Sequence, residues 1–430
     1  MFFLILFLFI GKISGISYSQ PNFSFNALWN PNGTTILNET FIGFDLLDFF
    51  IDQNNTFYIP NRNTGQILLF SQRNLTKTIS INLTNSSTIF VKTNGNIYVD
   101  TFYSIYGGIS EIKYNMIINP IKRMNLCQQC FDLFVTENDI LYCSFTERHQ
   151  ILAKSLINNW NLLLIVAGTG TQGSTSTTLR YPHGIFVENL TSNLYVADCG
   201  NDRIQLFQSE KLTAITIVGN GSINITINLN CPTAIILDTS KYLYIADSGN
   251  NRIIGQEING FSCLIGCSNS FGSASNQLNQ PLSLSFDNSG NIYVNDRGNN
   301  RIQKFNLIRP ECFSYITIND PSRLTTDNGG CFLCDATVFN STTTWVRFIG
   351  AGGTQLATTP PLSNRCRTCA AGWYRGSLPA PGMTVNGTVC YVWNSDNCSM
   401  PNQISATNCG SFYVFGLVAP QACLRRYCTI

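Results

Sequence analysis

Three copies of one phrase decide the fold of this chain: Tyr195-Val-Ala-Asp-Cys-Gly-Asn-Asp-Arg-Ile204, Tyr244-Ile-Ala-Asp-Ser-Gly-Asn-Asn-Arg-Ile253 and Tyr293-Val-Asn-Asp-Arg-Gly-Asn-Asn-Arg-Ile302. Each copy begins 49 residues after the previous one, and an internal period of this size is typical of a repeat architecture. In every copy two β-rich runs flank Asp-x-Gly-Asn-x-Arg. We therefore expect an antiparallel hairpin whose Gly and Asn residues supply positive φ angles at the turn.

The polar residues that recur in the phrase are expected to stabilise this turn. The Asp side chains can accept hydrogen bonds from turn N–H groups, and each Arg lies close enough to pair with its Asp. We assign this structural role to Asp198, Gly200, Asn201, Arg203, Asp247, Gly249, Asn250, Arg252, Asp296, Gly298, Asn299 and Arg301. Binding is expected instead where the copies differ, as at Cys199, Ser248 and Arg297, and in the loops around them.

Weaker relatives of the phrase precede the regular copies, and the six units have aromatic anchors at Tyr58, Tyr98, Tyr142, Tyr195, Tyr244 and Tyr293. The better units add a preceding strand, such as Pro182–Val187, and a following strand, such as Thr216–Gly219. Four strands in ~40–50 residues are typical of a β-propeller blade. We therefore predict an all-β, six-bladed propeller over residues 25–307. A strand within residues 26–36 is expected to complete the sixth blade, because an open ring leaves an unpaired edge.

The region from residue 312 to residue 430 follows a different pattern. Nine cysteines lie between Cys331 and Cys428, and the propeller phrase does not recur there. This density predicts a small module held together by disulfides. The sequence thus divides near residues 307–310 into a propeller and a cysteine-rich domain.

Two known families resemble these regions. The repeated phrase, with its lead-in Tyr181-Pro-His-Gly-Ile185, resembles the NHL repeat, which implies a six-bladed propeller used mainly as a binding platform, although the peptide-amidating lyases share it. The cysteine-rich region resembles the eight-cysteine domain of uromodulin and glycoprotein 2 through motifs in the same order: Trp345–Gly350, Gly372-Trp373, Val389–Trp393, Asn408–Val414 and Cys423–Cys428. The chain departs from that family at Cys398-Ser399, where a Cys-Cys doublet is usual, and lacks its Asn after Trp373.

Cysteine positions predict several disulfides. Cys143 is expected to pair with Cys127 or Cys130, and we also predict the bridges Cys199–Cys231 and Cys263–Cys267. The full set of disulfide candidates is Cys127, Cys130, Cys143, Cys199, Cys231, Cys263, Cys267, Cys331, Cys334, Cys366, Cys390, Cys398, Cys409, Cys423 and Cys428. Because the chain has 17 cysteines, at least one is expected to be free or to form an intermolecular bridge.

The N-terminus predicts export from the cell. Residues 1–10 are almost wholly apolar and are followed by small residues, so residues 1–17 are expected to be a signal peptide. No later run is long enough to span a membrane. The many Asn-x-Ser/Thr sequons predict glycosylation at loop sites, with these candidates: Asn32, Asn38, Asn74, Asn189, Asn220, Asn340 and Asn386.

The composition excludes several functions. Charged residues make up only 12% and the net charge is +2, so nothing favours nucleic acid as a partner. The two histidines, His149 and His183, cannot supply a His-rich metal site, and no catalytic constellation or cofactor motif stands out. We therefore expect no catalytic, cofactor or metal site, and predict a secreted glycoprotein that recognises an extracellular protein or carbohydrate. The alternatives are a metal-dependent extracellular lyase or lactonase that uses the channel, and a matrix protein linked through its unpaired cysteine.

Overall fold

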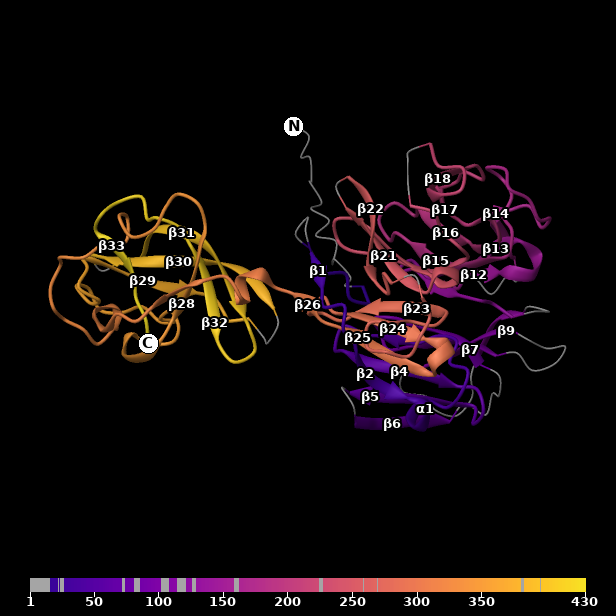
Figure 1. Cartoon of the computed structure of the whole chain (residues 1–430), viewed down its shortest axis with the longest axis horizontal. Helices are drawn as coiled ribbons and strands as arrows, with labels where there is room; N and C mark the ends of the chain where they lie inside the picture. The colour runs from indigo at the N-terminus through magenta and orange to yellow at the C-terminus, as the bar shows by residue number, and fades with distance from the viewer. Residues whose placement is uncertain are drawn as a thin grey trace, which may run out of the picture. The chain divides into compact units, whose positions relative to one another are not determined.

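The computed structural model describes residues 16–430 with short gaps at residues 22, 24–26, 72–73, 81–85, 102–107, 114–120, 126–128, 158–161, 224–226, 258, 269, 380–382 and 395. Cys127 and residues 1–15 of the expected signal peptide lie outside the described residues. The chain divides into two compact units, Met1–Leu307 and Ile308–Ile430 (Figure 1). This division falls where the propeller phrase gives way to the cysteine-rich pattern.

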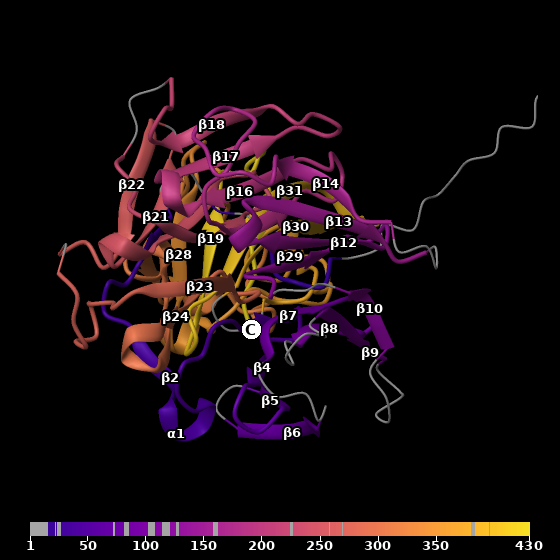
Figure 2. The same cartoon turned by 90° about the vertical axis from the view of Figure 1, so that its right-hand side faces the viewer.

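The first unit contains six four-stranded antiparallel sheets, which are the blades of the expected propeller (Figures 1 and 2). The first three blades are formed by β3 (Phe50–Ile51), β4 (Thr56–Asn61), β5 (Gln66–Ser71) and β6 (Asn74–Ser80), by β7 (Ser86–Val91), β8 (Ile97–Thr101), β9 (Gly108–Ile112) and β10 (Ile121–Asn125), and by β11 (Leu133–Val135), β12 (Ile140–Phe145), β13 (Gln150–Ser155) and β14 (Leu164–Gly168).

The last three blades contain the regular phrases. They are formed by β15 (Pro182–Val187), β16 (Leu194–Asp198), β17 (Arg203–Phe207) and β18 (Ala214–Gly219), by β19 (Pro232–Leu237), β20 (Leu243–Asp247), β21 (Arg252–Glu257) and β22 (Gly260–Ile265), and by β23 (Pro281–Phe286), β24 (Ile292–Asp296), β25 (Arg301–Phe305) and β2 (Thr34–Asn38). Short elements β1 (Leu28–Trp29), α1 (Glu39–Ile42) and β26 (Leu307–Ile308) complete this part of the chain.

The sixth blade closes the ring with a strand from the other end of the domain. β2 pairs antiparallel with β25, with Thr34 opposite Lys304 and Asn38 opposite Arg301. The prediction of a six-bladed, ring-closed propeller is therefore confirmed, with the closing strand ending at Asn38 rather than at residue 36. Residues before the predicted start at residue 25 also contact the propeller, because the Ser17 carbonyl accepts the Gln53 N–H at 3.1 Å.

The turn between the second and third strands corrects one expectation. In the regular blades it is a 3₁₀ turn, and the positive φ angles belong to Asp202, Asn251 and Asn300, just before the Arg. The glycine is required for space instead. A Cβ atom on Gly249 would lie 2.5 Å from the side chain of Asn230, so any larger residue would push the preceding loop away. The missing side chain of glycine, rather than its left-handed backbone, is what this turn needs.

Tyrosine anchors tie the strands of several blades together through buried carboxylates. The hydroxyl group of Tyr195 donates to Glu188 at 3.3 Å, and that of Tyr293 donates to Asp287 at 3.2 Å. In the degenerate second blade, Tyr98 donates to Glu111 at 3.0 Å. The aromatic anchor therefore also satisfies an acidic side chain, which explains why it is Tyr rather than Phe.

The second unit contains a seven-stranded mixed sheet in the order β27-β28-β32-β31-β30-β29-β33. Its strands are β27 (Ile316–Ile318), β28 (Thr344–Phe348), β29 (Ala370–Arg375), β30 (Thr384–Trp393), β31 (Asp396–Asn408), β32 (Tyr413–Leu417) and β33 (Arg425–Tyr427). The large side chains of Tyr374, Tyr391, Phe415 and Tyr427 are fully buried in its core. This unit thus has its own hydrophobic core, as expected of a separate domain.

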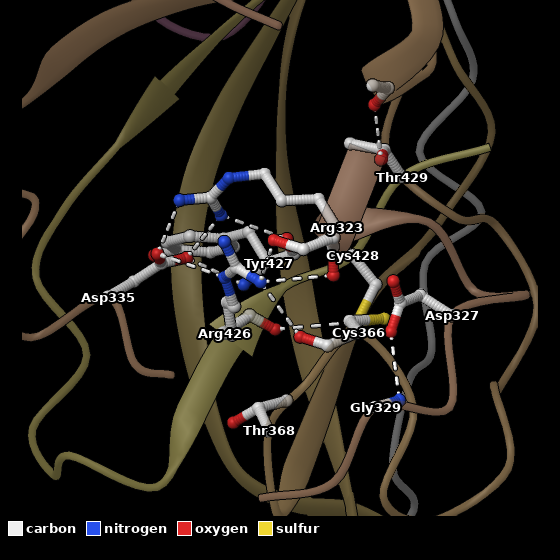
Figure 3. Close-up of a disulfide and its surroundings, with 12 residues drawn as sticks. Arg323, Asp327, Gly329, Asp335, Cys366, Thr368, Arg426, Tyr427, Cys428 and Thr429 are labelled. Atoms are coloured by element: carbon white, nitrogen blue, oxygen red, sulfur yellow. Dashed lines mark hydrogen bonds and ion pairs between the residues drawn. A yellow bond between two sulfur atoms is a disulfide. The ribbon is translucent and has the colours of Figure 1, made fainter. Parts of the chain in front are cut away.

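A buried charge network supports the end of this sheet. Arg323 donates to both carboxylate oxygens of Asp335, at 2.6 and 2.8 Å, and Arg426 also reaches toward Asp335 (Figure 3). Arg426 donates to the carbonyl oxygens of Ser322 and Cys366 at 3.0 Å each. The bidentate geometry and these extra hydrogen bonds offset the desolvation of the buried charges. The network joins the first residues of the domain to its last strand.

Eight disulfides connect the described cysteines: Cys130–Cys143, Cys199–Cys231, Cys263–Cys267, Cys312–Cys409, Cys331–Cys369, Cys334–Cys423, Cys366–Cys428 and Cys390–Cys398. The two bridges predicted individually in the propeller are among them, and Cys143 pairs with Cys130 rather than Cys127. The predicted set omitted Cys312 and Cys369, which pair with Cys409 and Cys331. This density of bridges is typical of an oxidising compartment.

Candidate ligand-binding site at the propeller channel

The recurring residues of the phrase form a closed set of contacts. The carboxylate of Asp247, which is 0% exposed, accepts the Asn230 N–H at 2.8 Å, the Asn250 amide at 2.9 Å and the Arg252 Nε–H at 2.8 Å. The other regular blades repeat this arrangement through Asp198 with Arg203 and through Asp296 with Arg301. Each Arg also donates to carbonyl oxygens of the loop that enters its blade. The side chains of the recurring Asp and Arg residues are thus engaged in contacts within the propeller.

The positions at which the copies differ are also engaged by the protein itself. Cys199 forms a disulfide with Cys231, and Ser248 is buried. Arg297 forms an ion pair with the exposed carboxylate of Asp45 at 2.8 Å, and Arg62 pairs with the same carboxylate at 2.9 Å. Cys199 and Arg297 therefore link neighbouring segments of the chain, and Ser248 is enclosed by the protein.

Tyr18, in the N-terminal segment, packs against the inner strands of the propeller. The ring of Tyr18 lies edge-on to Phe90, Phe134 and Phe186, with centroid distances of 6.3, 5.8 and 5.7 Å. Burial raises the pKa of its hydroxyl group above the usual value, with Glu137 and Glu188 adding to the effect. The three phenylalanines come from the inner strands of blades two, three and four. Tyr18 therefore packs into an aromatic arc that the inner strands build.

The backbone on either side of Tyr18 is attached to two blades. Tyr18 forms a β-bridge with Asp52 of the first blade, and the Thr239 N–H of the fifth blade donates to the Pro21 carbonyl at 3.1 Å. Gln20 also donates from its side chain to the Leu237 carbonyl at 3.2 Å. This segment, residues 16–21, thus crosses from one blade to another and holds Tyr18 in place.

Two carboxylates line the small cavity of about 110 Å³ beside Tyr18. Asp48 accepts the Thr88 hydroxyl at 3.0 Å and the Ile89 N–H at 3.1 Å, whereas Asp132 accepts the Ile185 N–H at 2.7 Å. Burial raises the pKa of both carboxyl groups, and the charge of Asp48 raises that of Asp132 further. Each carboxylate bonds to the next blade in the ring. Both side chains therefore join blades as well as lining the cavity.

A wider pocket of about 420 Å³ is lined by residues of several blades, among them Ser87, Phe131, Glu147, His183 and Leu282. The His183 ring stacks on Phe131 with a centroid distance of 3.8 Å and an interplanar angle of 8°. Burial lowers the pKa of His183 to about 4, so the imidazole is neutral at physiological pH. Its Nδ1 has no hydrogen-bond partner among the described residues. The pocket therefore offers apolar walls and a few polar atoms that a ligand can engage.

His183 also lies beside the Cys199–Cys231 bridge, because one of its ring nitrogens and the two sulfur atoms fall within 4.8 Å of one another. A cysteine binds a metal ion as the thiolate. Since the two sulfur atoms are bonded to each other, neither is a thiolate. This cluster is therefore a disulfide packed against a histidine.

His149, the other histidine, accepts the Tyr181 N–H at Nδ1 at 3.2 Å.

The candidate glycosylation sites differ in accessibility. Asn32, Asn220, Asn340 and Asn386 are exposed, as glycosylation requires. Asn38 is also exposed, but its side chain caps α1 by accepting the Thr40 N–H at 3.2 Å. Asn189 is half-buried and accepts the Glu137 N–H at 3.3 Å. Asn74 begins β6, and its side chain lies outside the described residues.

A known family matches part of each of the two units. Residues 278–305 match the NHL repeat, and residues 346–429 match the eight-cysteine domain of the uromodulin-like family. The chain therefore combines an NHL-repeat propeller with a uromodulin-like domain. Among the described residues, no helix has the length and apolar character needed to cross a membrane.

Two relatives match the second unit. The chain is 31% identical over 121 residues to the pancreatic secretory granule membrane major glycoprotein GP2 of Homo sapiens, covering 28% of this chain and 22% of that protein. It is 35% identical over 120 residues to uromodulin of Mus musculus, covering 27% of this chain and 18% of that protein. The chain thus spans only about a fifth of the length of these relatives, and the similarity concerns one domain.

A solved structure resembles the propeller in fold. A Bacteroides thetaiotaomicron protein of unknown function superposes with a TM-score of 0.51 at 12% identity, covering 69% of this chain and 76% of that protein. At this identity the likeness concerns the fold alone.

Proposed function

We propose that the protein is a secreted glycoprotein that recognises an extracellular protein or carbohydrate ligand through the propeller face and the uromodulin-like domain. One observation carries this proposal: residues of several blades together line a pocket of about 420 Å³. Loops of a rigid scaffold are the usual position of binding residues. The uromodulin-like domain and the disulfides support an extracellular location.

Binding of the exported, full-length protein to arrays of extracellular glycans and matrix proteins tests the proposal. Glu147 is an exposed residue of the pocket, and Glu147→Lys is expected to weaken binding of any ligand that enters there. Glu257→Lys is the matched control, because Glu257 is exposed at the end of β21 and outside that pocket. Equal binding by both variants would rule out this pocket. Failure to find any ligand on a broad panel would contradict the recognition function itself.

An extracellular enzyme that uses the channel is the second candidate. The buried carboxylates of Asp48 and Asp132 favour it, because carboxylates in a cavity are ligands for hard cations such as Ca²⁺. Both, however, already accept hydrogen bonds from the next blade. Metal analysis of protein purified without chelator separates the candidates: one bound ion per chain that is lost in Asp132→Asn supports an ion-dependent activity, and metal-free protein supports recognition.

A further inference from the structure

A second pocket lies in the uromodulin-like domain and is built around Arg347 of β28. The Arg347 guanidinium carbon lies 3.8 Å from the centroid of the Phe412 ring and 5.8 Å from that of Tyr315. Its Nη1 donates to the Tyr315 hydroxyl at 3.1 Å. The two rings meet edge-on with centroids 5.5 Å apart. The cation is therefore held in one orientation by two aromatic residues before any ligand arrives.

The Cys312–Cys409 disulfide holds the segments that carry the two aromatic residues beside Arg347. Tyr315 and Phe412 each follow one of the bridged cysteines by three residues. The Cys409 N–H also donates to the Phe412 carbonyl at 2.8 Å, which closes the turn between β31 and β32. The bridge thus ties both segments together beside Arg347. Preorganisation of this kind reduces the ordering that a ligand would otherwise require.

Arg347 differs in its charge environment from Arg323 and Arg426, two buried arginines of the same domain. Arg323 and Arg426 form ion pairs with Asp335 or Asp320. No ion pair joins Arg347 to a carboxylate of the described residues. In the segment that carries Tyr315, the carboxylate of Glu311 is engaged by the Thr384 and Thr407 hydroxyl groups at 3.2 and 3.1 Å. The guanidinium therefore retains the capacity to bind an anion.

The pocket in front of Arg347 has a volume of about 380 Å³, enough for a small ligand. Its lining combines groups that can bond hydroxyls with apolar surface. Thr354, Gln355 and Ser411 contribute hydroxyl and amide groups, and Ile349 and Phe412 contribute apolar walls. Thr354 and Ser411 are exposed, so the pocket is reached directly from solvent. An anion site ringed by hydroxyl-bonding groups and apolar carbon surface suits a charged sugar.

We infer that this pocket binds an acidic saccharide, with Arg347 pairing with the carboxylate or sulfate group of the sugar. The inference rests on the proposed recognition function and names a ligand class for the uromodulin-like domain. The guanidinium would form two parallel hydrogen bonds to the anion, while Thr354, Gln355 and Ser411 bond the sugar hydroxyls.

The test uses the exported full-length protein and four probes: N-acetylneuraminic acid, N-acetylglucosamine 6-sulfate, neutral N-acetylglucosamine and acetate. Calorimetric or NMR titration is expected to show binding of one or both acidic sugars, and to separate a carboxylate preference from a sulfate preference. Arg347→Gln is expected to weaken this binding by about tenfold or more. Arg347→Lys retains the charge without the bidentate geometry. Its affinity for the acidic sugars is expected to lie between those of the wild type and Arg347→Gln.

Arg375→Gln is the matched control, because Arg375 is an exposed arginine on β29 of the same domain. It is expected to leave the affinity unchanged, and circular dichroism checks that each variant is folded. Equal binding by wild type and a folded Arg347→Gln protein overturns the inference, as does acetate or the neutral sugar binding as tightly as the acidic sugars, or no binding of any probe. If these titrations fail while the array experiment still finds a ligand sensitive to Glu147, the inference falls and the proposed function stands.

Discussion

The ring of Tyr18 lies edge-on to the ring of Phe134, with 5.8 Å between their centroids, and joins the segment of residues 16–21 to the third blade. Tyr18→Ala removes a ring that also contacts Phe90 and Phe186, so we expect the free energy of unfolding of the propeller to fall by about 3 kcal/mol or more. Denaturant unfolding monitored by aromatic fluorescence measures this. Tyr18→Phe keeps the ring and is the control; a loss as large as that of the Ala variant would mean that the hydroxyl, not the ring, is important.

Replacement of one buried carboxylate of the repeated turns is predicted to be costly. Asp247→Asn keeps the shape of the side chain but leaves Arg252 without its charge partner, so the free energy of unfolding is expected to fall by about 3 kcal/mol. Asp45→Asn is the control, since Asp45 is 48% exposed and forms ion pairs at the surface, which contribute about 1 kcal/mol or less. Chemical unfolding of the two variants compares them. Similar losses of unfolding free energy in both variants would argue against burial of the ion pair as the reason for the large effect of Asp247→Asn.

The disulfides of the uromodulin-like domain are predicted to contribute according to the chain they enclose. Cys312–Cys409 spans 97 residues and Cys390–Cys398 spans 8. Replacing both cysteines by Ser is expected to cost about 4 kcal/mol for the long bridge and about 2–3 kcal/mol for the short one. Thermal unfolding under non-reducing conditions shows which of the two double variants loses more stability. The long-bridge variant is also expected to lose acidic-sugar binding, because its aromatic walls are released; retained binding would contradict the role given to that bridge.

Stability of the propeller is predicted to depend on pH through His183. Burial lowers the pKa of His183 to about 4 in the folded protein, whereas the unfolded chain has an ordinary value near 6.5. Between these values the unfolded state binds more protons, so stability rises with pH and is lost on acidification from pH 6.5 to 4, by ~3 kcal/mol at most. His183→Phe keeps the stacking on Phe131 and removes the titration. The unfolding free energies of the two proteins should differ by a constant amount above pH 6.5, and only the wild type should lose stability through His183 between pH 6.5 and 4; parallel curves across this range would exclude His183 as the source.

Cys127 is predicted to carry the unpaired thiol. The eight bridges use sixteen cysteines, and Cys127 is the remaining one of the 17. Thiol titration of the denatured, unreduced protein is expected to give one equivalent per chain, or none if the chains form covalent dimers on a non-reducing gel. Both signals should vanish in Cys127→Ser. A thiol or dimer that persists in this variant would locate the unpaired cysteine elsewhere.

The propeller was predictable because its signal is local and repeated. The phrase from Tyr244 to Ile253 contains a complete hairpin, so one copy identifies the strand pair and its recurrence identifies the ring. Even the degenerate blades retained an anchor such as Tyr98. The role of Gly249 was not predictable, because the atoms that require a glycine belong to Asn230 in the preceding loop.

The sites escaped prediction because their residues meet only after folding. Tyr18 stands in a short polar stretch without periodicity, and its contacts come from three blades. Arg347 sits within a recognised motif, yet Tyr315 and Phe412 lie far from it in sequence and are joined by a bridge that includes Cys312. Spacing cannot reveal such a bridge. Local patterns therefore predicted the scaffold, and long-range contacts determine where a ligand can bind.

Closure of the sixth blade has a consequence for synthesis. Because Thr34 pairs with Lys304, the sheet that seals the ring cannot form until nearly the whole propeller has left the ribosome. Contacts this distant in sequence slow folding. Until the last strand has been synthesised, the strand edges of the incomplete blade remain unpaired and exposed. A nascent chain stalled before residue 301 should therefore remain sensitive to proteases and engaged by chaperones. Release of the complete ring, rather than of each blade, would then set the pace of secretion.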